Sequence, residues 1–169
     1  MTPDLRDDAF WDEAAQEPLA PRRGRRSKAE LIAERVETRG RSRALQALYA
    51  ADLRDFSRLK RIASNVFDDL AIDAGEREFA TKIVATMGDR GAEIDAMLAE
   101  VTANWRFERL GAIERSVLRL AAAELARGET PVKVVLQEAV RLAERYGTAR
   151  SAKFVNGVLD AYARRTGRL

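Results

Sequence analysis

The sequence predicts an all-α fold, a compact bundle of six or seven helices that follows a disordered N-terminal leader. Three observations lead to this prediction. Three of the four prolines lie within the first 21 residues, so a single proline remains to interrupt the rest of the chain. Beyond residue 27, apolar residues recur at spacings of three and four, as in amphipathic helices. No stretch alternates apolar and polar residues over the length of a strand.

Charge divides the beginning of the chain into two parts. Residues 1–20 carry six carboxylates and one arginine, a net charge of −5, whereas residues 21–43 carry nine basic residues and three carboxylates, a net charge of +6. An acidic stretch followed by a basic one is typical of a tail and not of a helix packed in a core. We therefore expect a mostly disordered leader over 1–37 and a helical domain over 38–169. A short helix can start at the capping box Ser27–Glu30 and run towards Gly40, where a break is expected.

The first half of this domain is expected to contain helices over about 41–54 and 57–72, each with one apolar stripe. Asp73–Glu76 resembles a capping box and predicts the start of another helix. Gly88 and Gly91 then punctuate the chain before the apolar period resumes. We expect these glycines to separate two helical segments.

The second half predicts three more helices. The first covers 110–127 and has Gly128 as its stop signal. The pair Thr130–Pro131 offers an N-cap followed by proline at the first helical position, and the helix that it opens is expected to end at Tyr146. The last helix is expected over about 151–165. The chain has no internal repeat of 20 to 50 residues.

The composition argues against most kinds of chemistry. The chain contains neither cysteine nor histidine, which excludes thiolate nucleophiles, Cys/His zinc sites and a histidine general base. No glycine-rich phosphate loop is present, and carboxylate pairs such as Asp68 and Asp69 fit an exposed helix face. We expect no enzyme activity, no cofactor and no metal. No apolar run approaches about 18 residues and no signal peptide is recognisable, so a cytoplasmic protein is expected.

A basic face is predicted on the helix that begins near Arg41. With Arg39 set at 0° on a helical projection, Arg43 lies at about 40° and Gln46 at about 340°, opposite the leucines, while Tyr49 lies near the boundary at about 280°. Arginine forks suit phosphate oxygens, and an adjacent aromatic ring can stack on an unpaired base. Arg41, at about 200°, belongs to this face only if it swings outward. The same pattern also fits an ordinary amphipathic helix with a solvated basic face.

Two residues in the last turn of this helix do not follow the pattern. Asp52 falls among the leucines and Leu53 falls beside Gln46. Fraying or a partner surface would accommodate both.

A second basic group is expected at the start of the last helix. Arg150 and Lys153 lie near a positive helix N-terminus, which is a reasonable anion site. Phe154 follows directly, but it borders the apolar stripe of its helix and therefore also fits the core. Gly157, within the same helix, suggests that a neighbouring helix packs closely there.

Six segments of the chain resemble those of one known family. They are Ala44–Tyr49, Trp105–Arg109, Ala112–Leu120, Glu124–Leu125, Pro131–Val135 and Lys153–Leu159. Together they resemble NusB, the family of bacterial transcription antitermination factors, over about residues 38–165. The resemblance implies an all-helical fold that binds the single-stranded boxA element of nascent RNA, chiefly ribosomal RNA leaders, jointly with the small-subunit ribosomal protein NusE. It further implies assembly with other Nus factors and RNA polymerase, and for some members a homodimer.

Positions of the first basic helix can be carried over from the family. The resemblance implies RNA contacts by Arg39 and Arg41, with Arg43 as their neighbour. It places Tyr49 near both the RNA and the partner protein, and Glu114 on the side of NusE. The predicted partner-binding residues are therefore Tyr49 and Glu114.

The last helix supplies the remaining predicted contacts. Lys153 and Phe154 match the RNA-facing start of this helix in the family. The loop before it is often acidic in the family, whereas here it contains Arg150. The complete set of predicted RNA-binding residues is Arg39, Arg41, Arg43, Gln46, Tyr49, Arg150, Lys153 and Phe154.

Two alternative functions are compatible with the sequence. The first is a purely protein-binding helical module whose basic stripe is incidental. The second is a relative of the NusB-like domain found in some ribosomal-RNA cytosine methyltransferases. Those enzymes continue into a Rossmann-like domain with a catalytic cysteine, whereas this chain ends at Leu169 and has no cysteine.

Overall fold

The computed structural model describes residues 27–169, except for the side chains of residues 30–34. This part of the chain is helical, and no β-strand occurs in it. The predicted all-α fold is confirmed, whereas the predicted disorder of residues 1–26 lies outside the described residues. In chain order the elements are α2 (Lys28–Leu53), the 3₁₀ helix η2 (Phe56–Arg58), α3 (Leu59–Asp69), α4 (Ala74–Val101), the 3₁₀ helix η3 (Phe107–Arg109), α5 (Ala112–Arg127), α6 (Val132–Tyr146) and α7 (Ala149–Arg165).

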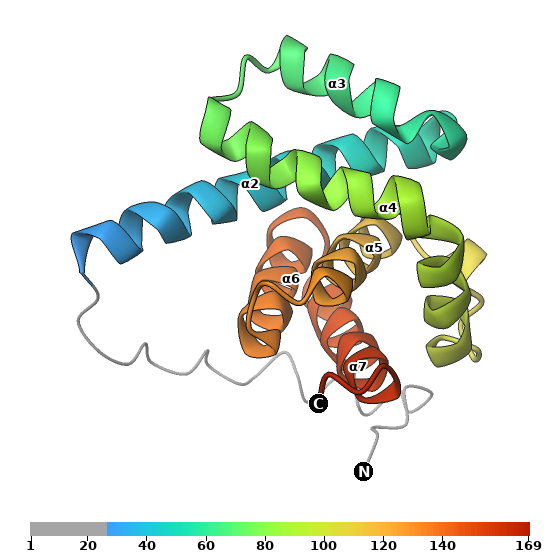
Figure 1. The fold of residues 1–169 in the computed structure, drawn as a ribbon. Helices are drawn as coiled ribbons and strands as arrows, with labels where there is room; N and C mark the ends of the chain where they lie inside the picture. Colours follow the sequence, from blue (N-terminus) through green and yellow to red (C-terminus); the bar gives the residue numbers. More distant parts are fainter. Residues whose placement is uncertain (1–26) are drawn as a thin grey trace.

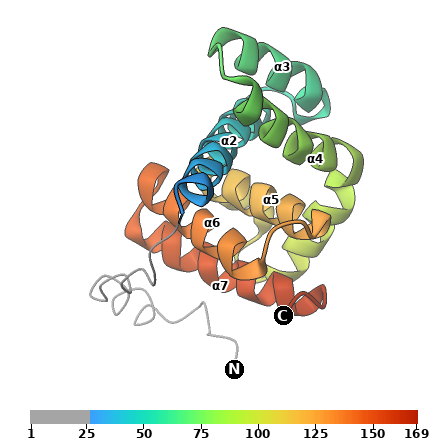
Figure 2. The ribbon, with the colours of Figure 1, turned by 60° about the vertical axis from the view of Figure 1, so that its left-hand side comes forward.

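The helices form two layers, and α5 lies in the lower one, where it contacts helices of both layers. In Figures 1 and 2, α2, α3 and the first part of α4 lie above, and α5, α6 and α7 lie below. Every residue of α5 from Ser116 to Leu125 is buried, whatever its direction on the helix. A helix that is buried on all sides is the centre of a bundle, and α5 indeed packs against α2, α4, α6 and α7.

Gly40 does not end a helix, as the sequence had suggested. Instead α2 is one helix of 26 residues that continues through the expected boundary between residues 37 and 38. A Cβ atom at Gly40 would lie 2.9 Å from Cβ of Phe79 on α4. The glycine therefore permits a close approach of α2 and α4. This packing offsets the cost of glycine within a helix, which is about 1 kcal/mol relative to alanine.

Gly88 and Gly91 do not separate two helices either, because α4 runs without a break over 28 residues. Figure 1 shows that the last part of α4 is turned at an angle to its first part and descends beside the lower layer. Glycines are a common cause of such bends. The two glycines therefore lie within α4 and do not end it.

Several helix ends confirm the sequence analysis, and one corrects it. Asp73 caps α4, since its carboxylate accepts a hydrogen bond from the Glu76 N–H at 2.9 Å. Gly128 ends α5 in the left-handed conformation, with φ of 69°. The N-cap of α6 is Pro131 and not Thr130, and no side chain caps this helix. None of the helices in residues 27–169 is long and apolar enough to cross a membrane.

Candidate nucleic-acid interface

The outward face of α2 carries four of the eight side chains predicted to bind RNA. Arg39 is 57% exposed, and Arg43, Gln46 and Tyr49 are partly exposed. The opposite side of the helix is buried in the core, where it places Ala44, Leu45, Ala47, Leu48 and Ala51. The predicted separation of a polar and an apolar face is therefore present, and α2 fixes the polar side chains on a rigid support.

A buried carboxylate orients the two arginines of this face. Glu76 of α4, whose side chain is 5% exposed, lies 3.2 Å from Nε of Arg39 and 3.2 Å from Nε of Arg43. Arg43 also donates from Nη1 to the side-chain oxygen of Gln46, at 3.3 Å. A guanidinium has five N–H donors, so these contacts do not exhaust its capacity to bind an anion. With two arginines and one carboxylate, the group keeps a charge of +1 and suits a phosphate.

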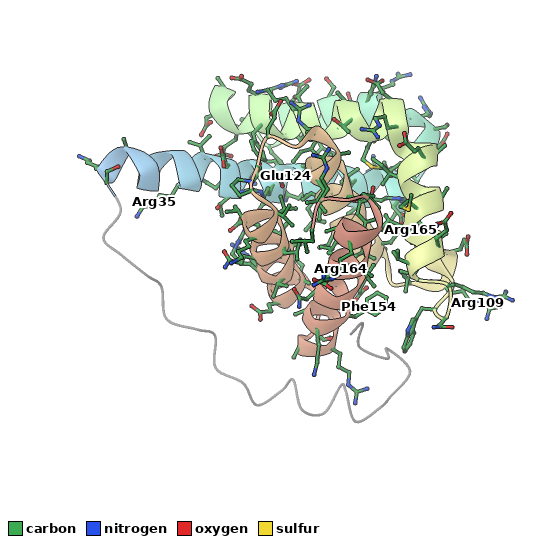
Figure 3. All side chains as sticks on the ribbon, turned by 60° about the horizontal axis from the view of Figure 1, so that its bottom comes forward. Arg35, Arg109, Glu124, Phe154, Arg164 and Arg165 are labelled. Carbon is green, nitrogen blue, oxygen red and sulfur yellow. The ribbon has the colours of Figure 1, made fainter. Side chains whose placement is uncertain are left out.

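Arg41 does not belong to this face. The expectation that it swings outward is wrong, because its side chain is 1% exposed and points into the bundle towards α5. Its Nε donates to Glu124 at 3.0 Å, its Nη1 lies 3.6 Å from Glu138 of α6, and its guanidinium lies over the ring of Phe79. Figure 3 shows Glu124 beside α2. Arg41 holds three helices together, and this geometry does not support direct contact with RNA.

The surroundings of Arg41 keep it charged. Burial alone would lower the pKa of its guanidinium, but the hydrogen bond and the charge of Glu124 more than offset this, so the pKa is raised above its ordinary value. The Arg41 guanidinium therefore stays charged at any physiological pH.

Asp52, which the sequence placed oddly among leucines, also faces α5. Its carboxylate accepts hydrogen bonds from Nη2 of Arg115 at 2.6 Å and from Nη1 of Arg119 at 2.7 Å. Arg119 continues the network to Asp95 of α4 and stacks over the ring of Phe56 at 4.0 Å. Although burial opposes it, pairing with Arg115 and Arg119 lowers the pKa of Asp52. The carboxylate joins the end of α2 to the start of α5, so neither fraying nor a partner is needed to explain it.

The start of α7 is held by a capping box that the sequence analysis missed. Thr148 accepts a hydrogen bond from the Ser151 N–H at 3.2 Å, and the Ser151 hydroxyl accepts one from the Thr148 N–H at 3.1 Å. The helix therefore begins at Ala149, earlier than expected. The Thr148-to-Ser151 spacing in the sequence could have revealed it, although Ser replaces the usual Glu or Gln.

This cap changes how an anion could bind at the start of α7. The Ser151 N–H is already satisfied, which removes one backbone donor from an anion at this place. The basic side chains near it are Arg150, which is exposed, and Lys153, which is partly exposed. The Ser151 hydroxyl also donates to Oε1 of Glu114. Glu114 thus fixes the first turn of α7 against the first turn of α5, and its contact with a partner protein stays a prediction.

Phe154 lies in the core and not on the surface. Its ring is buried and meets Trp105 edge to face, with centroids 5.7 Å apart. The ring that reaches solvent at this place is Trp105, which is 37% exposed in the turn after α4. In the sequence, Trp105 continues the apolar spacing of α4, but it lies beyond the end of that helix at Val101.

Direct contacts connect the two predicted basic regions. Asp52, one turn after Tyr49, pairs with Arg115 of α5. The neighbouring residue, Glu114, bonds to Ser151 of α7. The second half of α2 and the starts of α5 and α7 therefore meet at one end of α5. Within residues 27–169, no group of three or more carboxylates is placed to hold a metal ion.

Comparisons with known proteins identify relatives of this chain. The sequence model of the NusB family matches residues 38–164. The chain is 40% identical over 131 residues to a transcription antitermination protein NusB from Sorangium cellulosum (strain So ce56), a match that covers 77% of this chain and 93% of that protein. It is 39% identical over 135 residues to the NusB protein of Anaeromyxobacter dehalogenans (strain 2CP-1 / ATCC BAA-258), covering 75% and 89% of the two chains.

Solved structures show the same similarity in three dimensions. A crystal form of T. maritima NusB superposes with a TM-score of 0.70 at 32% identity, covering 76% of this chain and 90% of that one. A chain in the crystal structure of the antitermination factors NusB and NusE in complex with dsRNA superposes with a TM-score of 0.71 at 31% identity, covering 78% of this chain and 98% of that one.

Proposed function

This chain belongs to the NusB family, and we propose from that membership that it is a transcription antitermination factor without catalytic activity. It binds the boxA element of nascent RNA together with NusE and joins RNA polymerase with other Nus factors, in the cytoplasm. The match covers nearly the whole length of the curated relatives. These relatives are transcription antitermination proteins, which favours this function over that of a methyltransferase domain.

The observation that carries this proposal is the arrangement of Arg39 and Arg43 around Glu76. The buried carboxylate holds two guanidiniums side by side on the outer face of α2, next to the amide of Gln46 and the ring of Tyr49. Oriented guanidiniums bind phosphates, while the amide and the ring can read a base by hydrogen bonding and stacking. The face therefore offers what a short single-stranded RNA requires.

The partner protein is proposed to bind where α2, α5 and α7 meet. The related NusB chain was solved with NusE and RNA, and this chain superposes on almost all of it. Tyr49 lies at the edge of the RNA face, and Glu114 lies at the junction of α5 and α7. Contact of both residues with NusE remains a proposal, as does a homodimer in the absence of partners.

RNA binding tests the proposed function directly. Fluorescence anisotropy would compare a short boxA RNA with a scrambled RNA of the same composition, each single-stranded and double-stranded, with and without NusE. We expect tighter binding of single-stranded boxA RNA, and a logarithmic salt dependence with a slope of about −0.7 for each neutralised phosphate.

Two outcomes would contradict this expectation. Equal affinity for boxA and scrambled RNA in the presence of NusE would exclude specific recognition. Binding of NusE without measurable affinity for any RNA would instead support the alternative of a protein-binding module. Leu53 is the feature that favours this alternative, because it is an exposed apolar residue at the end of α2.

A further inference from the structure

The first turns of α2 lie outside the part of the chain that matches the NusB family. The helix begins at Lys28, whereas the family match begins at residue 38. Figures 1 and 3 show this beginning of α2 projecting past the other helices. The chain therefore adds a helical extension to the family fold.

The extension is firmly fixed where it leaves the bundle. A Cβ atom at Gly75 would lie 3.1 Å from Cγ1 of Val36, so the first turn of α4 packs closely against α2 at this point. Thr38 donates a hydrogen bond to Glu138 of α6 at 3.1 Å, and Arg41 is paired with Glu124. Because α2 is continuous across these anchors, the bundle determines the direction of the extension.

The exposed cations of the extension continue the basic face of α2. Lys28 and Arg35 are both exposed, and on the projection that places Arg39 at 0° they lie at about 340° and 320°. Arg39 also leans towards Arg35, since its Nε donates to the Arg35 carbonyl oxygen at 3.4 Å. At 1.5 Å per residue, the row from Arg39 back to Lys28 is about 16 Å long. We call Lys28, Arg35 and Arg39 the basic row.

The described carboxylates near this row do not cancel it. Glu37 lies about 160° from Arg39 around the helix, and its carboxylate is 3.7 Å from Arg41. Glu76 pairs with Arg39, but it is shared with Arg43, and the Asp73 carboxylate also interacts with Arg39 through its charge. Two carboxylates thus face four cations, Lys28, Arg35, Arg39 and Arg43, and the net charge of these described residues stays positive. A straight row of cations on one side of a rigid helix is suited to following a nucleic-acid backbone, whose charges are also arranged in a line.

We infer that the basic row binds phosphates of the RNA that flanks the boxA element, and so lengthens the RNA footprint beyond that of the family fold. The inference rests on the proposed function, because the row continues the face assigned to boxA. Contacts of cations with phosphates carry no base specificity. The flanking RNA would therefore contribute to affinity whatever its sequence.

The test uses the full chain with NusE and three RNAs: boxA alone, boxA with ten uridines on its 5′ side, and boxA with ten uridines on its 3′ side. The unchanged protein should bind one of the extended RNAs several-fold more tightly at low salt. The variant Lys28→Gln/Arg35→Gln should lose this gain and still bind boxA alone within about twofold. Its salt slope on the extended RNA should become shallower by about 1.4, which corresponds to two phosphates.

A matched control removes two positive charges elsewhere. Lys60 and Lys82 are exposed on α3 and α4, so Lys60→Gln/Lys82→Gln changes the net charge equally without touching the basic row. This variant should keep the full gain from the flanking RNA. Thermal melting should show that both variants are folded.

The outcomes separate this inference from the proposed function. No gain from either flank, or an equal loss in the control variant, would overturn the inference while boxA binding stands. Weakened binding of NusE with unchanged RNA affinity would show that the row is a protein contact, and would also overturn it. If the unchanged protein does not bind boxA alone, the proposed function fails and the inference fails with it.

Discussion

Arg41 of α2 and Glu124 of α5 form a buried ion pair, in which both Nε and Nη2 of Arg41 donate to the carboxylate, Nε at 3.0 Å. The two residues are separated by 83 positions in the sequence, and each is almost fully excluded from solvent. The pair fixes the crossing of α2 over the central helix. It therefore sets the position of the face that carries Arg39 and Arg43.

Arg41→Ala is expected to destabilise the protein by about 3–5 kcal/mol, because it leaves the Glu124 carboxylate buried without its partner. Urea unfolding followed by circular dichroism measures this change. Arg41→Met combined with Glu124→Leu should recover most of the loss, since it removes both charges together. If Arg41→Ala costs less than about 1 kcal/mol, the description of Arg41 as a structural residue is wrong.

The ion pairs of Asp52 should make the stability of the protein depend on pH. Its pairing with Arg115 and Arg119 holds its folded-state pKa below the ordinary value of 3.8. The stabilisation is thus fully present above the unfolded-state pKa and is lost as the pH falls through the lower folded-state pKa. In Asp52→Asn, Arg115 loses its paired carboxylate at neutral pH and Arg119 keeps only Asp95. We expect this variant to be less stable than the unchanged protein near pH 7.

Unfolding measured in urea between about pH 7 and pH 3 tests this expectation. The difference between the two proteins should become smaller as the pH falls, because the unchanged protein loses the same charge. Asp95→Asn is a suitable comparison, since Arg119 retains Asp52 in that variant. A difference that is constant over the whole pH range would contradict the assignment.

The fold was largely predictable because it depends on local patterns. Apolar spacing, Asp73 as a cap and Gly128 as a stop signal all act within a few residues. The errors concern residues whose role depends on a distant element. Gly40 was read as a break, but Phe79 of another helix explains it. Arg41 was read as a surface cation, but its partner is 83 residues away.

The candidate site shows the same division. Helical geometry placed Arg39, Arg43 and Gln46 on one face, and the structure places them there. No local pattern could reveal that Glu76 orients the two arginines, because it comes from α4. The opposite error occurs at Phe154. The family resemblance predicted RNA contact by this ring, but the fold buries it against Trp105.

Surface and core positions should separate RNA binding from stability. Arg43→Ala and Lys153→Ala are each expected to weaken binding of boxA RNA by about tenfold, or ~1.4 kcal/mol, through the loss of a phosphate contact. Arg43 can be removed with little cost to stability, because Glu76 keeps Arg39 as a partner. Leu120→Ala should instead destabilise the fold by about 2–5 kcal/mol, as is usual for a buried leucine.

Anisotropy titrations and thermal melts of the same samples measure both quantities. Arg164→Ala provides the matched control, because Arg164 is an exposed arginine at the far end of α7 that pairs with Asp160. It should change neither RNA affinity nor stability appreciably. RNA binding that survives Arg43→Ala and Lys153→Ala intact would remove these residues from the interface.

Two glycines inside helices allow a direct test of close packing between α2 and α4. Alanine favours a helix over glycine by about 1 kcal/mol, so Gly→Ala within a helix should stabilise unless the added methyl group clashes. At Gly91 the nearest atom to a new Cβ is Cε of Met87 at 3.5 Å, an ordinary contact. Gly91→Ala is expected to raise the unfolding free energy by about 0.5–1 kcal/mol.

Gly40→Ala should have the opposite effect. Its new methyl group would lie 2.9 Å from Cβ of Phe79, an atom attached to the backbone of α4 that cannot move aside alone. Overpacking of this kind costs about 1–3 kcal/mol, which exceeds the gain in helix propensity. Thermal melting should therefore place Gly40→Ala below the unchanged protein and Gly91→Ala above it. Equal stabilisation by both substitutions would show that the contact of α2 with α4 is looser than the structure describes.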